Sequence, residues 1–290
     1  MIVVTGATGN VGRELVRELA ARNAEFRVLV RDPARAVGLP ERAERVVGNL
    51  DDPATLGAAF DGADALFLLV PGIGLDHAVA AVAAARAAGI GHIVQLSSFH
   101  AAIDPMPAMG RWHHEREQVV AGSGIPVTVL RPGGYMTNAL EWAPVIRAGG
   151  EVLDPTGPGR YAPIDPADIA AVAAAALIEP GHQGRVYHLT GTETCTIAEQ
   201  VATISRVIGA DIKIREAATP EQALQSRYPG GAPPALAAAI IEWFSMMRAD
   251  TIGFRTDTVR QLLGRDPVSF EQWCVRNIDA FRAPEAVGAC

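Results

Sequence analysis

The sequence lacks the features of a disulfide-stapled, metal-binding or membrane-spanning protein. It has only three cysteines, Cys195, Cys274 and Cys290, which are scattered and odd in number. This usage predicts neither a disulfide framework nor a metal site, and it favours a reducing, cytoplasmic compartment. Because no run of about twenty apolar residues occurs, we expect no membrane span. A predicted strand begins at Ile2, which leaves no room for a signal peptide.

Positive charge is also scarce. The chain carries 25 Lys and Arg residues against 32 Asp and Glu residues, so its net charge of −7 argues against a nucleic-acid partner. Lys213 is the only lysine. Hydrophobic residues make up 49% of the 290 positions, enough for a substantial core. We expect a small-molecule substrate, no nucleic-acid or membrane partner, and a monomer or homodimer.

Apolar runs alternate with helix-like patterns through the first half of the chain. This alternation predicts a Rossmann-like α/β fold with a doubly wound parallel sheet. In such sheets ligands bind at the carboxyl ends of the strands, so the residues that follow each strand are the informative ones. We expect strands at residues 2–4, 26–30, 45–47, 65–70, 93–96 and 127–130, and helices at 11–21, 53–60, 76–88 and 111–121.

Residues 5–12 read Thr-Gly-Ala-Thr-Gly-Asn-Val-Gly and join the first predicted strand to the first predicted helix. In this setting Gly6 permits a tight turn, Gly9 lets a pyrophosphate approach the backbone, and Gly12 lets the helix pack closely on the strand. The backbone N–H groups at the helix N-terminus also favour a phosphate. The motif therefore predicts a dinucleotide-binding turn, with cofactor contacts from Gly6, Thr8, Gly9, Asn10, Val11 and Gly12.

Residues after the later strands extend this predicted site. Arg31 suits the 2′-phosphate of NADP, whereas an acidic residue such as the adjacent Asp32 suits the ribose hydroxyls of NAD. The sequence thus predicts a preference for NADP(H) and leaves NAD(H) open. Asn49 and Leu50 suit the edge and face of the adenine. The other expected cofactor residues follow the fourth to sixth strands or lie on the helix before the sixth: Val70, Pro71, Ser97, His113 and Pro132.

The second half of the chain predicts a smaller lobe. We assign residues 1–150 to the dinucleotide-binding core, to which segments near 162–190 return, including a strand at 186–189. Residues 151–290 then form mainly a smaller, substrate-binding lobe. Asp165 and Pro166 read as a helix N-cap and first helical position, and Asp168 lies in the first turn, so both aspartates are interpreted as structural. The tail at 283–290 is expected to be disordered.

These motifs together resemble the short-chain dehydrogenase/reductase superfamily, and most of all its atypical NmrA-like subgroup of NAD(P)H-binding proteins. The likeness runs along nearly the whole chain, and the combination of motifs is more specific than the glycine turn alone. The residues that carry it lie at 5–12, 29–33, 48–51, 122–132, 163–170 and 263–273.

The sequence departs from this superfamily at the expected catalytic positions. Typical members use a tyrosine, which donates a proton to the substrate carbonyl, and a lysine four positions later. Here the corresponding helix positions hold Met109 and His113, and no Tyr-x-x-x-Lys occurs. Reduction of a simple ketone needs a positioned acid, whereas a quinone or an extended conjugated electrophile spreads the charge. The missing pair therefore favours the second kind of substrate.

Three residues are candidates for catalysis, each with a structural alternative. His113 titrates near neutrality and could donate a proton or bind the nicotinamide ribose, or it could pair with Glu117 one turn further along the helix surface. Tyr135 is either an acid or the aromatic wall of a pocket. Ser97 either orients the substrate, touches the cofactor or ends its strand.

Aromatic and methionine side chains offer a surface for a flat aromatic substrate. The alternative for each is a place in the core. The segment at 228–234, rich in proline and glycine, is either a lid or a plain connector. The expected pocket residues are Phe99, Met109, Trp112, Tyr135, Met136, Phe244 and Met247.

The leading hypothesis is an NAD(P)H-dependent reductase that passes hydride to a bulky conjugated carbonyl, a quinone or a polycyclic aromatic compound without the Tyr/Lys pair. The resemblance also implies an alternative, a regulatory protein that senses NAD(P) without turnover. A further alternative is a tailoring enzyme of aromatic natural products, including oxygenation-linked steps. In each case the nicotinamide cofactor would carry the chemistry or the signal.

Overall fold

The computed structural model describes residues 1–249 and 253–282, so the tail that we expected to be disordered lies outside the described residues. The chain divides into two compact units. Unit 1 comprises residues 1–133, 166–189 and 256–266, and unit 2 comprises 134–165, 190–255 and the chain from Pro267 onward. The division falls after Gly133, whereas the sequence placed it near residue 150.

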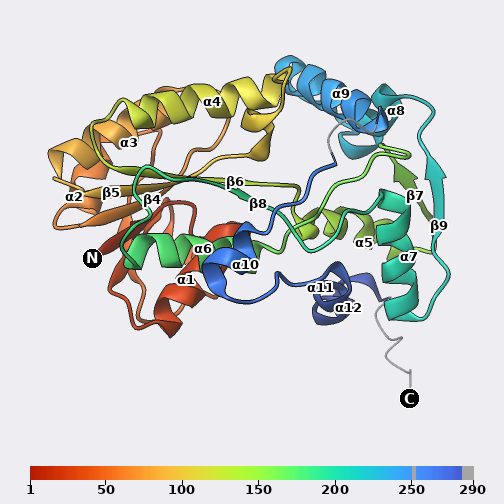
Figure 1. Ribbon diagram of the computed structural model, residues 1–290, viewed down its shortest axis with the longest axis horizontal. Helices are drawn as coiled ribbons and strands as arrows, with labels where there is room; N and C mark the ends of the chain where they lie inside the picture. The colour runs from red at the N-terminus through yellow and green to blue at the C-terminus, as the bar shows by residue number, and fades with distance from the viewer. Residues whose placement is uncertain (250–252, 283–290) are drawn as a thin grey trace. The chain divides into compact units, whose positions relative to one another are not determined.

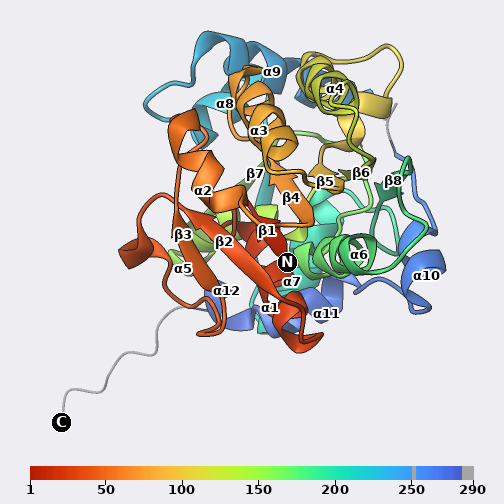
Figure 2. The same cartoon turned by 90° about the vertical axis from the view of Figure 1, so that its left-hand side faces the viewer.

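Unit 1 is built on a seven-stranded sheet in the order β3-β2-β1-β4-β5-β6-β8, in which every neighbouring pair is parallel (Figure 2). This confirms the predicted doubly wound sheet, and β8 joins it as expected. The strands are β1 (Ile2–Val4), β2 (Phe26–Val30), β3 (Glu44–Val47), β4 (Ala65–Leu69), β5 (His92–Leu96), β6 (Val127–Pro132) and β8 (Val186–Leu189).

Helices cover both faces of this sheet because its apolar residues point alternately to either side. On one face, α1 (Asn10–Ala21) packs against α6 (Pro166–Ile178), and the many alanines of α6 allow a close approach (Figures 1 and 2). On the other face, α2 (Leu56–Phe60), α3 (Asp76–Ala87) and α4 (Ala108–Ala121) share a buried hydrophobic cluster with β1, β4 and β5. The short α10 (Thr258–Leu263) packs on α6 and β8.

The connections of unit 1 include three short 3₁₀ helices, η1 (Pro33–Arg35), η2 (Pro53–Thr55) and η3 (Phe99–Ala102). The predicted helix at 53–60 is therefore a 3₁₀ turn that continues into α2. The two aspartates at the start of α6 are buried and bonded to arginines of their own units: Asp168 accepts from Arg265 at 2.7 Å in unit 1, and Asp165 accepts from Arg276 in unit 2. Both contacts agree with a structural role.

Unit 2 contains a two-stranded parallel sheet of β7 (Glu151–Asp154) and β9 (Lys213–Glu216). Its core includes Trp273, which stacks on Phe270 and meets Phe281 edge-on. A capping box between Thr196 and Glu199 starts helix α7 (Ile197–Ile208). The helices are η4 (Met136–Trp142), α5 (Ala143–Arg147), α7 (Ile197–Ile208), α8 (Pro220–Arg227), α9 (Pro234–Arg248), α11 (Phe270–Arg276) and α12 (Ile278–Phe281).

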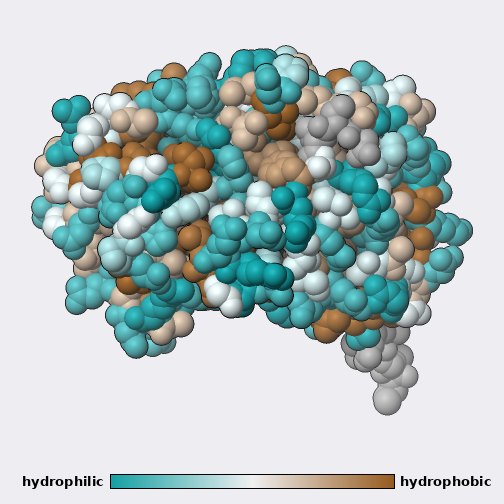
Figure 3. All heavy atoms as spheres, in the orientation of Figure 1, coloured by the Kyte–Doolittle hydropathy of each residue, from teal (hydrophilic) through white to brown (hydrophobic). Residues whose placement is uncertain are grey.

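Hydrophilic side chains dominate the face seen in Figure 3, with hydrophobic groups in small patches. Within the described residues, no helix combines the length and apolar character needed to span a membrane. Unit 2 also holds the two cysteines that the structure describes. Cys274 is buried and Cys195 is partly buried, and burial raises the pKa of each thiol to about 12.

Candidate functional site

The candidate site lies where the strand order of unit 1 reverses, between β1 and β4. At such a switch point the connections leave the two neighbouring strands in opposite directions, which opens a crevice at their carboxyl ends. Thr5 fixes this point. Its hydroxyl accepts a hydrogen bond from the Leu69 N–H at 2.8 Å and lies 3.1 Å from the Phe67 carbonyl oxygen, to which it donates. The glycine turn therefore begins from a fixed backbone position.

The glycine turn has the close packing that the sequence predicted. Gly6 has a φ of +67°, in the left-handed region that favours glycine. A Cβ on Gly12 would lie 2.1 Å from the carbonyl oxygen of Gly6, so helix α1 could not approach the strand with any larger residue there. Gly9 is the N-cap of α1 and offers no side-chain cap. A helix N-terminus without a side-chain cap suits the binding of a pyrophosphate.

Arg31 follows β2 and is exposed. Within the part of the chain that the structure describes, its guanidinium makes no hydrogen bond or ion pair, whereas the neighbouring Asp32 caps η1 by accepting from the Ala34 N–H at 2.9 Å. The charge of Arg31 acts on Asp51 only at longer range, where it contributes to the lowered pKa of that carboxyl group, so the hydrogen-bond donors of Arg31 fit a phosphate group. The residues present thus fit a dinucleotide, and the assignment of Arg31 to its 2′-phosphate remains a prediction.

Two loops beside the glycine turn are joined by a histidine. His77 Nε2 lies 2.6 Å from a carboxylate oxygen of Asp51, and His77 Nδ1 lies 3.3 Å from the carbonyl oxygen of Pro71. The hydrogen bond from His77 is the main cause of a lowered pKa for Asp51. The loops after β3 and β4 are therefore coupled. The side chains of Leu50 and Val70 belong to the hydrophobic cluster beneath α2 and α3, and their contact with the cofactor stays a prediction.

Ser97 directly follows β5, and its hydroxyl donates a hydrogen bond to Glu117 on helix α4. Arg131 on β6 binds the same carboxylate through Nε at 2.9 Å and through Nη2 at 2.5 Å. The side chain of Glu117 is only 7% exposed, so this ion pair is buried. Sequence reasoning missed Glu117 and Arg131 as a pair, because their partners are distant in the chain and no local pattern marks them.

His113 lies one turn before Glu117 on α4, but Glu117 is already bound to Ser97 and Arg131. The environment lowers the pKa of His113 to about 4, first because burial disfavours the charged imidazolium and second because Arg116 is near. His113 is therefore neutral at physiological pH. The lowered pKa disfavours a role as proton donor and is compatible with a neutral hydrogen-bonding role, and both roles stay predictions.

The predicted pocket residues are divided between the two units. Phe99 is buried in unit 1, where η3 packs on α4, and Met109 and Trp112 on α4 are partly buried. Tyr135 belongs to unit 2, and burial raises its pKa to about 12, which makes it a weaker acid. The other three lie buried within unit 2: Met136, Phe244 and Met247. Their place in a substrate pocket remains a prediction.

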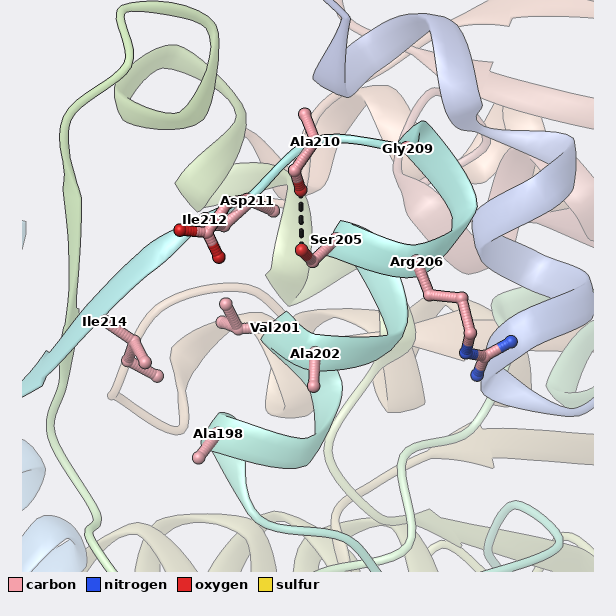
Figure 4. Close-up of a pocket in the computed structure, with 10 residues that line it drawn as sticks. All are labelled: Ala198, Val201, Ala202, Ser205, Arg206, Gly209, Ala210, Asp211, Ile212 and Ile214. Carbon is pink, nitrogen blue, oxygen red and sulfur yellow. Dashed lines mark hydrogen bonds between the residues drawn. The ribbon is translucent and has the colours of Figure 1, made fainter.

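Unit 2 also has a cavity of about 490 Å³ beside α7 and β9 (Figure 4). Small apolar side chains such as Ala198, Val201 and Ala202 line it, and the Ser205 hydroxyl donates to the Ala210 carbonyl at its edge. None of the predicted site residues belongs to its lining.

The fold and the site define an α/β protein that binds a dinucleotide at the switch point of a parallel sheet. Comparison with known families makes this specific. The model of the NAD(P)H-binding family matches residues 6–180, and the chain belongs to this family.

Known relatives cover almost the full chain. It is 37% identical to an NAD(P)H azoreductase of Xenophilus azovorans over 98% of this chain and 100% of the relative. It is 40% identical to a (4-alkanoyl-5-oxo-2,5-dihydrofuran-3-yl)methyl phosphate reductase of Streptomyces griseus, with the same coverage. Among solved structures, the NADPH complex of an Escherichia coli quinone oxidoreductase has a TM-score of 0.83 and 28% identity, covering 96% of this chain and 99% of that one.

These likenesses confirm two predictions made from the sequence. The chain is an NAD(P)H-binding protein with the atypical, NmrA-like form of the short-chain reductase fold, which NmrA itself shares. It is also an NAD(P)H-dependent reductase, since the two relatives described above are reductases and match it over almost its full length.

Proposed function

We propose that this reductase prefers NADPH and passes hydride to quinones or to other bulky conjugated carbonyl compounds. The proposal depends on how charge is handled when the substrate is reduced. When bound, the nicotinamide ring supplies the hydride, and the substrate oxygen then gains negative charge. A simple alkoxide needs a nearby acid, whereas a quinone or conjugated enone spreads the charge over several atoms.

The observation that carries the proposal is the absence of an acid on the face of α4 where the superfamily places its tyrosine and lysine. Met109 cannot donate a proton, and His113, whose pKa is about 4, holds no extra proton at pH 7. The next residue on that face, Glu117, is bound to Arg131. Such a site supports substrates that stabilise their own charge and take the proton from water.

The names of the relatives point the same way. An azoreductase and a quinone oxidoreductase both reduce electron-poor conjugated systems. The NADPH in the related quinone oxidoreductase and the exposed guanidinium of Arg31 in this chain support NADPH as the preferred cofactor. The role of the protein is then to hold the two rings in reacting distance and orientation.

The direct test is NADPH oxidation by the purified protein with a panel of benzoquinones, naphthoquinones, conjugated enones and simple aliphatic ketones. We expect turnover with quinones and conjugated carbonyls and at least about 100-fold lower kcat/KM with aliphatic ketones, because each lost proton donor costs about that factor. The absence of cofactor oxidation with any quinone or conjugated ketone would contradict the proposal.

The variant H113Q tests the role of the histidine. Glutamine keeps a hydrogen-bonding side chain without a titrating group, so kcat with a quinone should stay within about 3-fold of wild type and be flat from pH 6 to 8 in both proteins. A wild-type rate that falls above pH 6 and becomes pH-independent in H113Q would identify His113 as an acid and overturn this interpretation.

The same experiments separate the reductase from a cofactor sensor, which the missing Tyr/Lys pair also fits. A sensor would bind NADPH and oxidise it with no substrate of the panel.

A further inference from the structure

Arg116 is a buried cation on helix α4 whose hydrogen bonds go to backbone carbonyls. The residue is only 3% exposed. Its Nε donates to the Gly74 carbonyl at 3.1 Å, Nη1 donates to the Val70 carbonyl at 3.5 Å, and Nη2 donates to the Gly72 carbonyl. Within the described chain it forms no ion pair, and the adjacent Glu117 is taken by Arg131.

All three acceptors belong to the 70–75 loop, which joins β4 to α3. This loop leaves β4 at the switch point of the sheet, on the same edge as the glycine turn. Gly72 has a φ of +75°, a conformation that favours glycine. The loop therefore has a defined conformation, and the Arg116 guanidinium binds the carbonyl of every second loop residue.

The orientation of these carbonyls also determines where the neighbouring backbone N–H groups of the loop point. In a planar trans peptide the C=O and N–H groups point in opposite directions. Because the carbonyls of Gly72 and Gly74 point at Arg116, the N–H groups of Ile73 and Leu75 point away from it. Neither N–H has a protein acceptor in the described structure. Backbone N–H groups presented together in this way bind anions.

We propose that Arg116 is a positioning residue for the cofactor. By holding the carbonyls of the 70–75 loop inward, it keeps the Ile73 and Leu75 amides turned out toward an anionic ligand at the switch point. The loop then binds the dinucleotide without first having to be ordered, which lowers the entropic cost of binding. The inference rests on the proposed function, since that function requires a dinucleotide at this edge of the sheet.

The test compares R116M, R116K and the matched control R111M. Arg111 lies on the same helix but is exposed, and its guanidinium donates to the Met106 carbonyl at 2.7 Å rather than to the 70–75 loop. We expect the Kd of NADPH for the apoprotein to rise about 10-fold in R116M and about 3-fold in R116K, which keeps the charge but not the planar fork. R111M should bind NADPH as the wild type does.

A second readout separates positioning from general loss of structure. Amide hydrogen exchange of peptides covering residues 70–76 should speed up at least 10-fold in R116M, while peptides covering β1 and β6 stay protected. With a quinone substrate, R116M should raise KM for NADPH and leave kcat within about 2-fold, because at saturation the loop is ordered by the ligand.

Three outcomes would decide whether Arg116 positions the 70–75 loop for the cofactor. NADPH affinity and loop exchange in R116M equal to those of wild type would overturn the role of Arg116 alone. Wild-type protein that does not bind NADPH would overturn the proposed function together with it. If R116M does not fold, unchanged affinity and exchange in R116K would overturn the inference, and a selective weakening would support it.

Discussion

Two arginines of unit 1 show how exposure decides what a cation can do. Arg31 is exposed after β2, and in the described structure its guanidinium forms no hydrogen bond or ion pair, so a phosphate can reach it from solvent. Arg116 is buried, and its donors are occupied by the carbonyls of the 70–75 loop. The first is suited to contact a ligand directly, and the second acts only through the backbone that it holds.

Arg31 should discriminate between the two nicotinamide cofactors. In R31A the charge-assisted contact to the 2′-phosphate is lost, so the Kd of NADPH should rise about 10- to 100-fold while that of NADH changes by less than about 2-fold. Fluorescence titration with both cofactors measures this. R17A, which removes an exposed arginine of α1 that pairs with Glu14, is the control. Equal weakening toward both cofactors would show that the preference has another origin.

The sequence predicts the roles of some single residues but not of others. Gly6, Gly12 and Arg31 could be assigned because their role depends on neighbours in the chain and on one strand–turn–helix pattern. Arg116 and Glu117 could not, because the carbonyls and side chains that they bind are 14 to 46 positions away. His113 was predicted to titrate near neutrality, and the structure corrects this, since only the fold shows that the side chain is enclosed.

Among the elements, helix α1 depends on its first turn for both packing and binding. An alanine at position 12 would bring its Cβ to 2.1 Å from the Gly6 carbonyl oxygen, so the helix must move away from the strand. We expect G12A to lower the free energy of unfolding by about 1–3 kcal/mol, as overpacking does, and to abolish measurable NADPH binding. Urea denaturation and cofactor titration on the same samples test both effects.

Gly57 offers the matched control for this substitution. It lies in helix α2, and an added Cβ there would meet nothing within 4 Å. G57A should therefore raise stability by about 0.5–1 kcal/mol, since alanine is the better helix former, and leave NADPH binding unchanged. NADPH affinity in G12A equal to that in G57A would argue against the turn as a phosphate site.

Strands with a clear hydrophobic pattern could be predicted from the sequence, and strands without one could not. The buried strands of unit 1 were predicted to within two residues because each is a compact apolar run. The strands β7 and β9 were not predicted, because each has only four residues, of which two in β7 and three in β9 are charged, and Glu151, Lys213 and Glu216 are exposed. Such strands are specified by their pairing with each other, which a single segment does not reveal.

Unit 1 is assembled from three segments that are not continuous in the sequence. Residues 166–189 and 256–266 both return to it after long excursions through unit 2. The first return was expected from the apolar strand at 186–189. The second was not, because it depends on the buried Val259 and on the ion pair of Arg265 with Asp168 rather than on a recognisable pattern.

Buried neutral histidines should make the stability of the whole protein sensitive to mild acid. Burial lowers the pKa of His100 to about 3 and that of His113 to about 4, against 6.5 in the unfolded chain. Between pH 6.5 and 4 the unfolded state therefore binds more protons, so stability is complete above pH 6.5 and declines as the pH falls. From pH 7 to pH 5 we expect a loss on the order of 1–2 kcal/mol for each histidine.

Urea denaturation at pH 7.5, 6.5, 5.5 and 5.0 measures this loss, and H113Q supplies the comparison. The variant should lose less stability than the wild type over the same range, because it lacks one of the histidines whose pKa burial lowers; His92 and His188 also belong to this group and are unchanged in the variant. The carboxylates with lowered pKa, such as Asp51 and Glu199, affect stability only at lower pH. Parallel curves for the wild type and H113Q would contradict the prediction.

The state of the described cysteines has a consequence for an enzyme that handles quinones. Quinones are alkylating agents that arylate thiolate sulfur, so a reductase of these compounds is exposed to chemical damage by its own substrate. Burial raises the pKa of Cys195 and Cys274 to about 12, so almost none of either is present as thiolate at neutral pH. At these two positions the fold resists inactivation by the molecules that it is proposed to reduce.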